Sequence, residues 1–403
     1  MQVENKLVSI FICSSVAYSP LKWSIITTFD FLLPLSILSI GFTFVYAIFL
    51  CHCLYCFRKL PKDAILLPIF LCFVWAITFV THLGYETYYI KILIGILATI
   101  PYYWAGRKIR DYRLLYKYLR VTAIVLTVSM YFWIIVYGVG EAEKYDQNAA
   151  YLVLPAIIIS SNEFIERLSV IHLINIIVAI FLIFAAGARG PFVIWGMFIM
   201  VKLFLIICQS SKKYRILFIA ISLVYIVVSN IQKIIYTIAE GLLQKDMSVR
   251  LLERLLEGNV MEDDARIKIL SCAKEHIISN PFLGVGLSSD RIIISEFFHV
   301  TDYYGNYPHN FLYEIMLHYG IAGGGLFLLC LMYMLFISLV KNKDYCSRNI
   351  SLMFCFFCFF PLLFSGSYLT KPLFFLFLGI VVSVFRKYRS EKYEKEGSLI
   401  SYK

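Results

Sequence analysis

The stretch from residue 170 to residue 208, VIHLINIIVAIFLIFAAGARGPFVIWGMFIMVKLFLIIC, decides the class of fold. Its only residues charged at neutral pH are Arg189 and Lys202. Each apolar half is close to the length of about 20 residues that a helix needs to cross a bilayer. Glycine and proline end helices, so the Gly-Ala-Arg-Gly-Pro sequence at 187–191 interrupts the run. The stretch therefore predicts two transmembrane helices joined by a tight turn.

The rest of the chain continues this pattern. Of 403 residues, 60% are hydrophobic and only 16% are charged, whereas a soluble domain has about 25% charged residues. This composition excludes a soluble enzyme, a disordered chain and a single-span receptor. We predict an all-α polytopic membrane protein with about 12 transmembrane helices, at about 6–19, 31–55, 64–81, 88–105, 121–139, 149–161, 170–186, 191–208, 216–235, 312–340, 349–365 and 373–385.

The distribution of basic residues predicts the topology. With both termini in the cytoplasm, the cytoplasmic segments of this map carry 23 Lys and Arg residues, and the short opposite loops carry four. That asymmetry is the positive-inside rule, and it accounts for the net charge of +11 without a nucleic-acid partner. Lys6 and the apolar run ending in Ala17-Tyr18-Ser19 loosely resemble a cleaved signal peptide, but we expect an uncleaved first span.

One connection differs from all the others. Residues 236–308 form a polar stretch with eleven acidic and seven basic residues, on the non-cytoplasmic side of the map. Apolar positions recur at helical spacing within it, so we expect a large, partly helical periplasmic loop, and long loops in compact chains are usually functional. The predicted organisation is a bundle of about nine spans at 1–235, this loop at 236–308, a C-terminal transmembrane segment at 309–385 and a basic cytoplasmic tail at 386–403.

Two polar features lie where the chain enters or leaves the membrane. Arg189 is flanked by Gly187, Gly190 and Pro191, which leave backbone N–H groups free beside a fixed positive charge. This combination suits an anion such as pyrophosphate, because a guanidinium binds phosphate with two parallel hydrogen bonds. A tight hairpin whose Arg reaches the lipid headgroups is the alternative. The second feature is His309, at the point where the chain re-enters the membrane. An imidazole there is placed to exchange a proton near neutral pH.

His309 belongs to a spaced pattern. Pro308-His309-Asn310 is followed by nine residues and then by Gly320-Ile321-Ala322-Gly323. The pattern resembles the signature of the bacterial O-antigen ligase and O-antigen polymerase superfamily. The Arg189-Gly190 pair agrees with this resemblance. Arg266, which precedes the Asn-Pro-x-x-Gly-x-Gly sequence at 280–286, also agrees with it. The resemblance covers about residues 180–340 in detail.

The resemblance implies a metal-independent, inverting glycosyltransferase of the bacterial inner membrane that needs no cofactor. Such enzymes move a glycan from undecaprenyl pyrophosphate onto a sugar hydroxyl at the periplasmic face. By the resemblance, Arg189 and Arg266 would neutralise the pyrophosphate, and His309 would be the general base or position the acceptor. Asn310 and Glu314 would help to bind substrate, with Glu314 placed to orient His309. Arg291 and Tyr307 are candidates for the wall of the site, whereas His318, outside the motif, is expected to tolerate substitution.

Several functions remain open from the sequence. We expect a polymerase of O-antigen or a related surface polysaccharide, whose partners are the lipid-linked oligosaccharide, an acceptor glycan, membrane lipids and a chain-length regulator. The alternatives are a ligase that transfers the glycan to lipid A–core, a protein O-oligosaccharyltransferase, and a flippase or transporter. A transporter should show an internal repeat, and none is evident. Cys51-His52-Cys53 with Cys56 lacks a second ligand pair at useful spacing, so we expect no metal.

Overall fold

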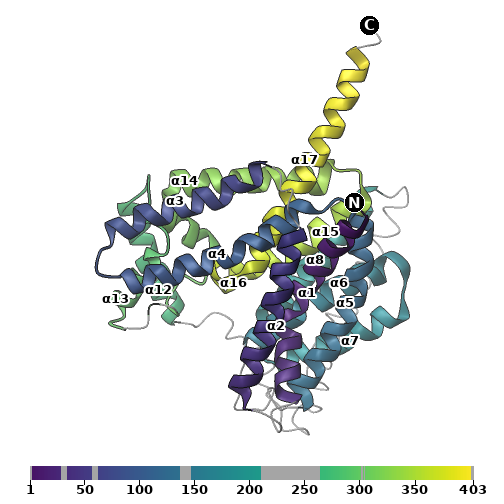
Figure 1. Cartoon of the computed structure of the whole chain (residues 1–403), viewed down its shortest axis with the longest axis horizontal. Helices are drawn as coiled ribbons and strands as arrows, with labels where there is room; N and C mark the ends of the chain where they lie inside the picture. Colours follow the sequence, from purple (N-terminus) through teal and green to yellow (C-terminus); the bar gives the residue numbers. More distant parts are fainter. Residues whose placement is uncertain are drawn as a thin grey trace. The chain divides into compact units, whose positions relative to one another are not determined.

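The computed structural model describes residues 2–28, 34–56, 62–136, 147–209, 264–300, 303 and 305–400, which form helices joined by turns and loops, with no strand among them (Figure 1). The predicted all-α class is confirmed. The predicted span at 216–235, the first part of the 236–308 loop and the side chains of the Cys51–Cys56 cluster lie outside the described residues.

Eleven of the twelve predicted apolar segments coincide with helices. These are α1 (Gln2–Thr28), α2 (Leu35–Cys56), α3 (Leu66–Thr81), α4 (Glu86–Lys108), α5 (Tyr112–Tyr131), α6 (Gln147–Arg167), α7 (Val170–Ala185), α8 (Arg189–Gln209), α14 (Phe311–Phe336), α15 (Tyr345–Phe354) with α16 (Phe360–Phe364), and α17 (Pro372–Ile400). Within the described residues, seven stretches are long and apolar enough to cross a membrane. The chain is therefore a multi-pass membrane protein, and the count of about twelve spans stays a prediction.

Helix α6 is longer than the predicted span at 149–161, because ion pairs hold charged residues at its end. Glu163 is fully buried, and its Oε1 lies 2.8 Å from Nε of Arg120 and 3.3 Å from Nε of Arg167. Glu166 forms a second ion pair with Lys202 of α8. A carboxylate at membrane depth is tolerated when such a partner is present, so the helix continues past the apolar run.

The chain divides into two compact units that cut across its linear order. Unit 1 comprises residues 1–15, 47–116 and 263–403, and unit 2 comprises residues 16–46 and 117–262. In unit 1, α4 and α17 pack with their backbones in close contact. A Cβ on Gly106 would lie 2.5 Å from the carbonyl oxygen of Leu376, and one on Gly379 would lie 2.3 Å from that of Tyr103. Small residues allow this approach between membrane helices.

Ion pairs join the segments of unit 1 that the topology map assigns to the cytoplasm. The Asp63 carboxylate binds Arg107, with 2.6 Å between the atoms, and also Arg386 of α17. Lys108 pairs with Glu4 at 2.9 Å. Lys387 pairs with the loop residue Asp344 at 2.8 Å. Because α17 runs through residue 386, the predicted basic tail begins inside a helix.

The segments that the map assigns to the opposite side also meet one another. Three elements, α12 (Asp264–Ser279), α13 (Ser289–Phe297) and the start of α14, lie together (Figure 1). The start of α4 and the loop around residues 365–371 contact them through hydrogen bonds. The candidate site is built at this end of unit 1.

Candidate functional site

The two glycine motifs of the sequence form one structural piece. Helix α14 is broken at Gly320, whose φ of 70° and ψ of 174° are not helical. The carbonyl oxygen of Pro281 enters the break and accepts hydrogen bonds from the backbone N–H groups of Ile321 (2.6 Å) and Ala322 (3.3 Å). The Asn-Pro-x-x-Gly turn thereby supplies the acceptor that the kinked helix lacks.

Only glycine fits at the two points of contact. A Cβ on Gly320 would lie 2.5 Å from the carbonyl group of Phe282, and one on Gly284 would lie 2.3 Å from the carbonyl oxygen of Leu317. Both glycines also have positive φ, where a side chain adds strain. This packing fixes α13, which follows the turn, against the first half of α14, which carries the His309 motif.

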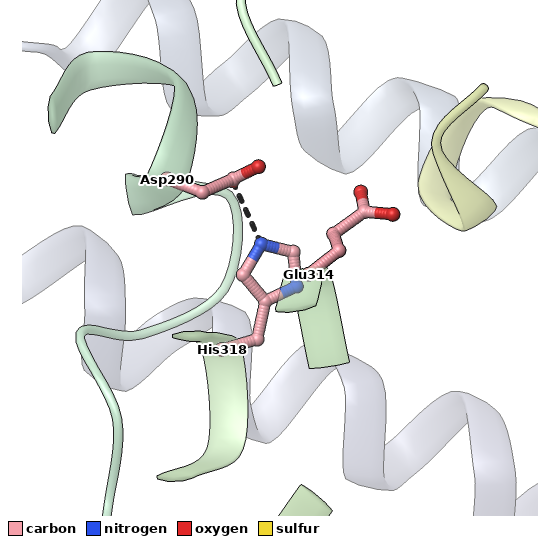
Figure 2. A group of neighbouring side chains, drawn as sticks. All are labelled: Asp290, Glu314 and His318. Atoms are coloured by element: carbon pink, nitrogen blue, oxygen red, sulfur yellow. Dashed lines mark hydrogen bonds and ion pairs between the residues drawn. The ribbon is translucent and has the colours of Figure 1, made fainter. Parts of the chain in front are cut away.

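A buried network of acidic, histidine and tyrosine side chains lies between α13 and α14. Asp290, Glu314 and His318 converge with their side chains fully enclosed (Figure 2). Nε2 of His318 lies 2.7 Å from Oδ1 of Asp290, and Nδ1 lies 2.7 Å from the hydroxyl of Tyr368. Glu314 accepts hydrogen bonds from the hydroxyl of Ser367 and from the backbone N–H of Tyr368 (3.2 Å). The loop at 365–370 is thus attached to α14 through Glu314 and His318.

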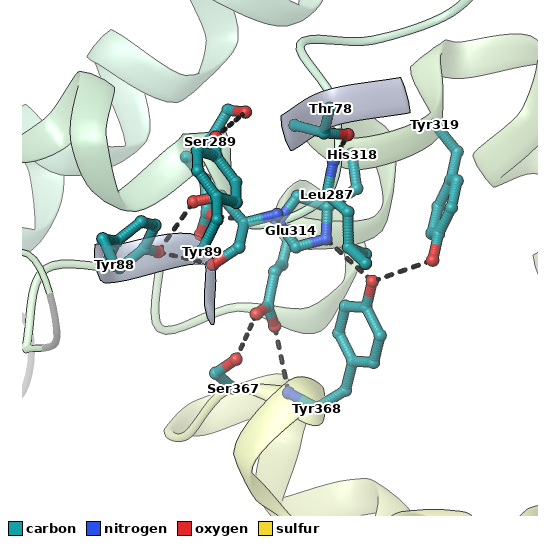
Figure 3. Close-up of polar contacts among 12 residues, drawn as sticks. Thr78, Tyr88, Tyr89, Leu287, Ser289, Glu314, His318, Tyr319, Ser367 and Tyr368 are labelled. Atoms are coloured by element: carbon teal, nitrogen blue, oxygen red, sulfur yellow. Dashed lines mark hydrogen bonds and ion pairs between the residues drawn. The ribbon is translucent and has the colours of Figure 1, made fainter. Parts of the chain in front are cut away.

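Tyrosines extend this network to neighbouring helices (Figure 3). The hydroxyl of Tyr368 donates to that of Tyr319 at 3.2 Å. At the start of α4, the hydroxyls of Tyr88 and Tyr89 bond to Ser288 and Ser289 respectively, at 2.5 and 2.9 Å between hydroxyl oxygens. Each of these tyrosine hydroxyls therefore has a partner, as buried polar groups require.

Arg291 is the buried cation of the site. Its side chain is 1% exposed, and none of its three guanidinium nitrogens has a hydrogen-bond partner among the described residues. Burial acts to lower the pKa of Arg291, but the charges of Asp290, Tyr88 and Glu314 outweigh it and leave the pKa raised. These neighbouring groups stabilise the positive charge of the buried guanidinium within the site.

The aromatic ring of Tyr307 connects Arg291 to His309. The guanidinium carbon of Arg291 lies 5.5 Å from the centroid of the Tyr307 ring, and the centroid of the His309 ring lies 4.1 Å from that of Tyr307. His309 has a φ of 52°, in the left-handed region. Burial raises the pKa of Tyr307, while Arg291, the backbone of Gly366 and the charge of Arg266 act in the opposite direction. Four residues proposed from the sequence (Arg266, Arg291, Tyr307 and His309) thus lie in one neighbourhood.

The remaining predicted residues have other surroundings. Asn310 caps α14: its Oδ1 accepts from the backbone N–H groups of Leu312 at 3.0 Å and Tyr313 at 3.4 Å. Glu314 was expected to orient His309, and its hydrogen bonds run to Ser367 and Tyr368. Arg189 belongs to unit 2, where it is half-buried at the start of α8, after Gly187 with a φ of 73°. The predicted interruption between two apolar helices is confirmed there.

The acidic network was missed by sequence reasoning. Glu314 and His318 are four residues apart on one helix, a spacing that places two side chains on the same face, so this pair could have been found. Asp290 is adjacent to Arg291, but nothing in the sequence links either residue to Ser367 or Tyr368. The expectation that His318 tolerates substitution does not fit a ring that is fully enclosed and bonded on both nitrogens.

Among the described residues, the ligand atoms of these three side chains are close enough together to hold a metal ion. One atom each from Asp290, Glu314 and His318 lie within 4.8 Å of one another. Both nitrogens of His318 and both oxygens of Glu314 already take part in hydrogen bonds. A metal ion would have to displace at least one of these bonds, so the geometry favours a hydrogen-bond network.

Comparison with protein families identifies the domain that contains this site. Residues 174–328 match the family model described as O-antigen ligase. This match supports the resemblance to the O-antigen ligase and polymerase superfamily over these residues. The matched segment includes Arg189, Arg266, the glycine motifs and His309, so the predicted resemblance is confirmed. Comparison with curated proteins and with solved structures gives no match.

Proposed function

We propose that this protein polymerises a surface polysaccharide by transferring an undecaprenyl-pyrophosphate-linked glycan onto a sugar hydroxyl. The observation that carries the proposal is the buried guanidinium of Arg291 joined through the Tyr307 ring to the imidazole of His309. A polyprenyl pyrophosphate donor needs a cation where charge develops on the leaving group and a group that takes the proton of the acceptor hydroxyl. The family match of residues 174–328 supports a glycan-transfer reaction in general.

In the proposed reaction the acceptor oxygen attacks the anomeric carbon of the donor sugar from the side opposite the pyrophosphate. The bond between that carbon and the phosphate oxygen breaks, and undecaprenyl pyrophosphate leaves with the electron pair. Arg291 and Arg266 neutralise the negative charge on the leaving group, while His309 takes the hydroxyl proton or holds the acceptor in place. The resemblance assigns binding of pyrophosphate to Arg189 as well. Attack from the opposite face inverts the anomeric configuration.

We further propose that the site faces the periplasm across the bacterial inner membrane. The ion-paired end of unit 1 carries the basic segments at 107–113 and 386–389. The positive-inside rule assigns such segments to the cytoplasm, so the opposite end, with His309, is outside. Reporter fusions after Leu243 and after Lys392 test this arrangement. Phosphatase activity at the second position, or its absence at the first, would refute it.

Lipopolysaccharide gels distinguish the polymerase from the ligase, which is the alternative. If the chain is a polymerase, a strain carrying His309→Asn should show core with a single repeat. If it is a ligase, the same strain should show core alone, with lipid-linked polymer accumulating. Asparagine tolerates the left-handed backbone of His309, and exposed His299, with a φ of 54°, offers the matched control His299→Asn. Wild-type banding from His309→Asn would contradict both assignments.

A further inference from the structure

The turn between α12 and α13 presents two large apolar side chains at the surface of unit 1. Leu283 is 86% exposed and Phe282 is 76% exposed, which makes them the two most exposed large apolar side chains among the described residues. They lie within residues 236–308, the polar stretch that the sequence places outside the membrane. Apolar side chains exposed to this extent are unfavourable in water, and neighbouring ones mark a contact surface.

The backbone of this turn is bonded to α14. The carbonyl oxygen of Pro281 accepts hydrogen bonds from two N–H groups at the kink of α14, and the N–H of Val285 donates to the carbonyl oxygen of Leu317 at 2.7 Å. Within the turn, the N–H of Gly284 donates to the carbonyl oxygen of Asn280 at 3.1 Å. Non-helical backbone is tolerated at a membrane only where the protein satisfies its polar groups, and these bonds meet that condition.

The kink of α14 marks the point at which this helix becomes fully apolar. Residues 321–340 carry no charge, and this run has the length of about 20 residues that a helix needs to cross a bilayer. Before the kink, the same helix carries Glu314 and His318, which are enclosed in the buried network. The turn is bonded to Ile321 and Ala322, the first two residues of the uncharged run. This contact places the turn at the edge of the run.

The polarity of α12 limits the apolar contact to the turn. Lys268, Lys274 and Glu275 are exposed on this helix, which ends at Ser279 just before the turn. Charged side chains are costly among acyl chains, so α12 belongs in water or among lipid headgroups. Segments at this boundary bury Phe and Leu side chains about 5–10 Å into the region where headgroups meet acyl chains.

We propose that the turn at 281–284 is an interfacial anchor, whose Phe282 and Leu283 side chains insert among the acyl chains of the phospholipids on that side of the membrane. Since α13 follows the turn directly, the anchor also holds α13, with Arg291, beside the membrane surface. The contact takes no part in glycan transfer, so it does not rest on the proposed function.

Photolabelling of the wild-type, full-length protein is the first test. The protein is placed in vesicles of phosphatidylglycerol and phosphatidylethanolamine that contain a phosphatidylcholine with a photoreactive diazirine in one acyl chain. Peptide mass spectrometry then locates the lipid adducts. We expect adducts on Phe282 or Leu283 in a yield similar to that on Leu329, which is 70% exposed on the apolar run of α14. Exposed Lys268 and buried Phe311 are the controls and should carry none.

The second test measures access from water in the same vesicles. A sulfonated maleimide is allowed to react with Leu283→Cys and with the matched variant Ser271→Cys, whose residue is exposed on α12. Peptide mass spectrometry separates both positions from the native cysteines. A charged reagent is strongly disfavoured among acyl chains, so we expect Leu283→Cys to react at least about ten-fold more slowly than Ser271→Cys. Both positions lie on one side of the membrane, so the orientation of the protein in the vesicles cancels.

Three results would overturn the proposal. If Leu329 carries adducts and the turn carries none, rapid reaction of Leu283→Cys means that the turn lies in water, and slow reaction means that protein covers it. The third result is loss of the adducts on the turn, but not on Leu329, when undecaprenyl pyrophosphate is added, because the surface would then bind a polyprenyl chain instead of phospholipid. The photolabelling uses the wild type, so it decides the matter even if a cysteine variant folds poorly.

Discussion

Replacing His318 with alanine removes the central member of the buried network. Its ring is fully enclosed and bonded to Oδ1 of Asp290 and to the hydroxyl of Tyr368, each at 2.7 Å. Tyr368 keeps a hydrogen bond to Tyr319, whereas Asp290 loses its bond to His318, and its Oδ2 already has no hydrogen bond among the described residues. Leaving a buried acceptor without its hydrogen bond costs about 1–3 kcal/mol, and more for a charged group, which is a considerable share of the roughly 5–15 kcal/mol that stabilises a typical domain.

The assay is thermal unfolding of the detergent-solubilised protein, followed by the fraction that remains monodisperse. We expect His318→Ala to unfold well below the wild type, and Asp290→Asn in the same background to restore part of the loss, since a neutral amide is less costly to bury than a carboxylate. His276→Ala is the control, because the ring of His276 contacts the carbonyl oxygen and the thiol of Cys272, one turn away on the same helix. A melting temperature of His318→Ala equal to that of the wild type would refute this reasoning.

Two further predictions concern the arginines and the kink of α14. Arg266→Lys and Arg189→Lys should each lose most glycan transfer at normal protein level, because lysine keeps the charge but not the planar fork. The control Lys22→Ala, which lies outside every motif, should leave glycan transfer nearly unchanged. Full activity of both lysine variants would contradict the proposal that these arginines bind pyrophosphate. Gly320→Ala should lower the yield of folded protein, because its Cβ would meet the Phe282 carbonyl at 2.5 Å. Gly325→Ala should not lower the yield, because a Cβ there would meet open space. Equal yields of the Gly320→Ala and Gly325→Ala variants would contradict the role of the kink.

Periodicity and charge predicted the helices well because each span depends on its own composition. The predicted segment at 88–105 lies inside α4 (Glu86–Lys108). The segment at 149–161 fell short of α6, since Glu163 and Glu166 are stabilised by partners on other helices, which apolar runs do not report. The kink at Gly320 was also missed: the apolar pattern continues through it, and only the contact with Pro281 explains it.

The candidate site was predictable only where motifs supply it. Spacing singled out His309, and the Arg-containing motifs led to Arg266 and Arg189. Their surroundings depend on contacts between distant parts of the chain, such as those of Tyr88 with Ser288 and of Glu314 with Ser367. Single-sequence patterns carry no information on such pairs. For the same reason His318 was taken for a tolerant position although the fold encloses it.

The most direct test of the account is the initial rate of glycan transfer by the purified protein, with a lipid-linked repeat as donor and acceptor. General-base assistance contributes about 10²–10⁴-fold, so His309→Asn should slow the reaction by a factor within that range. His299→Asn should stay within about two-fold of the wild type, since exposed His299 lies outside the network. A loss of only a few-fold in His309→Asn, at equal folded protein, would contradict the assignment of proton transfer to His309.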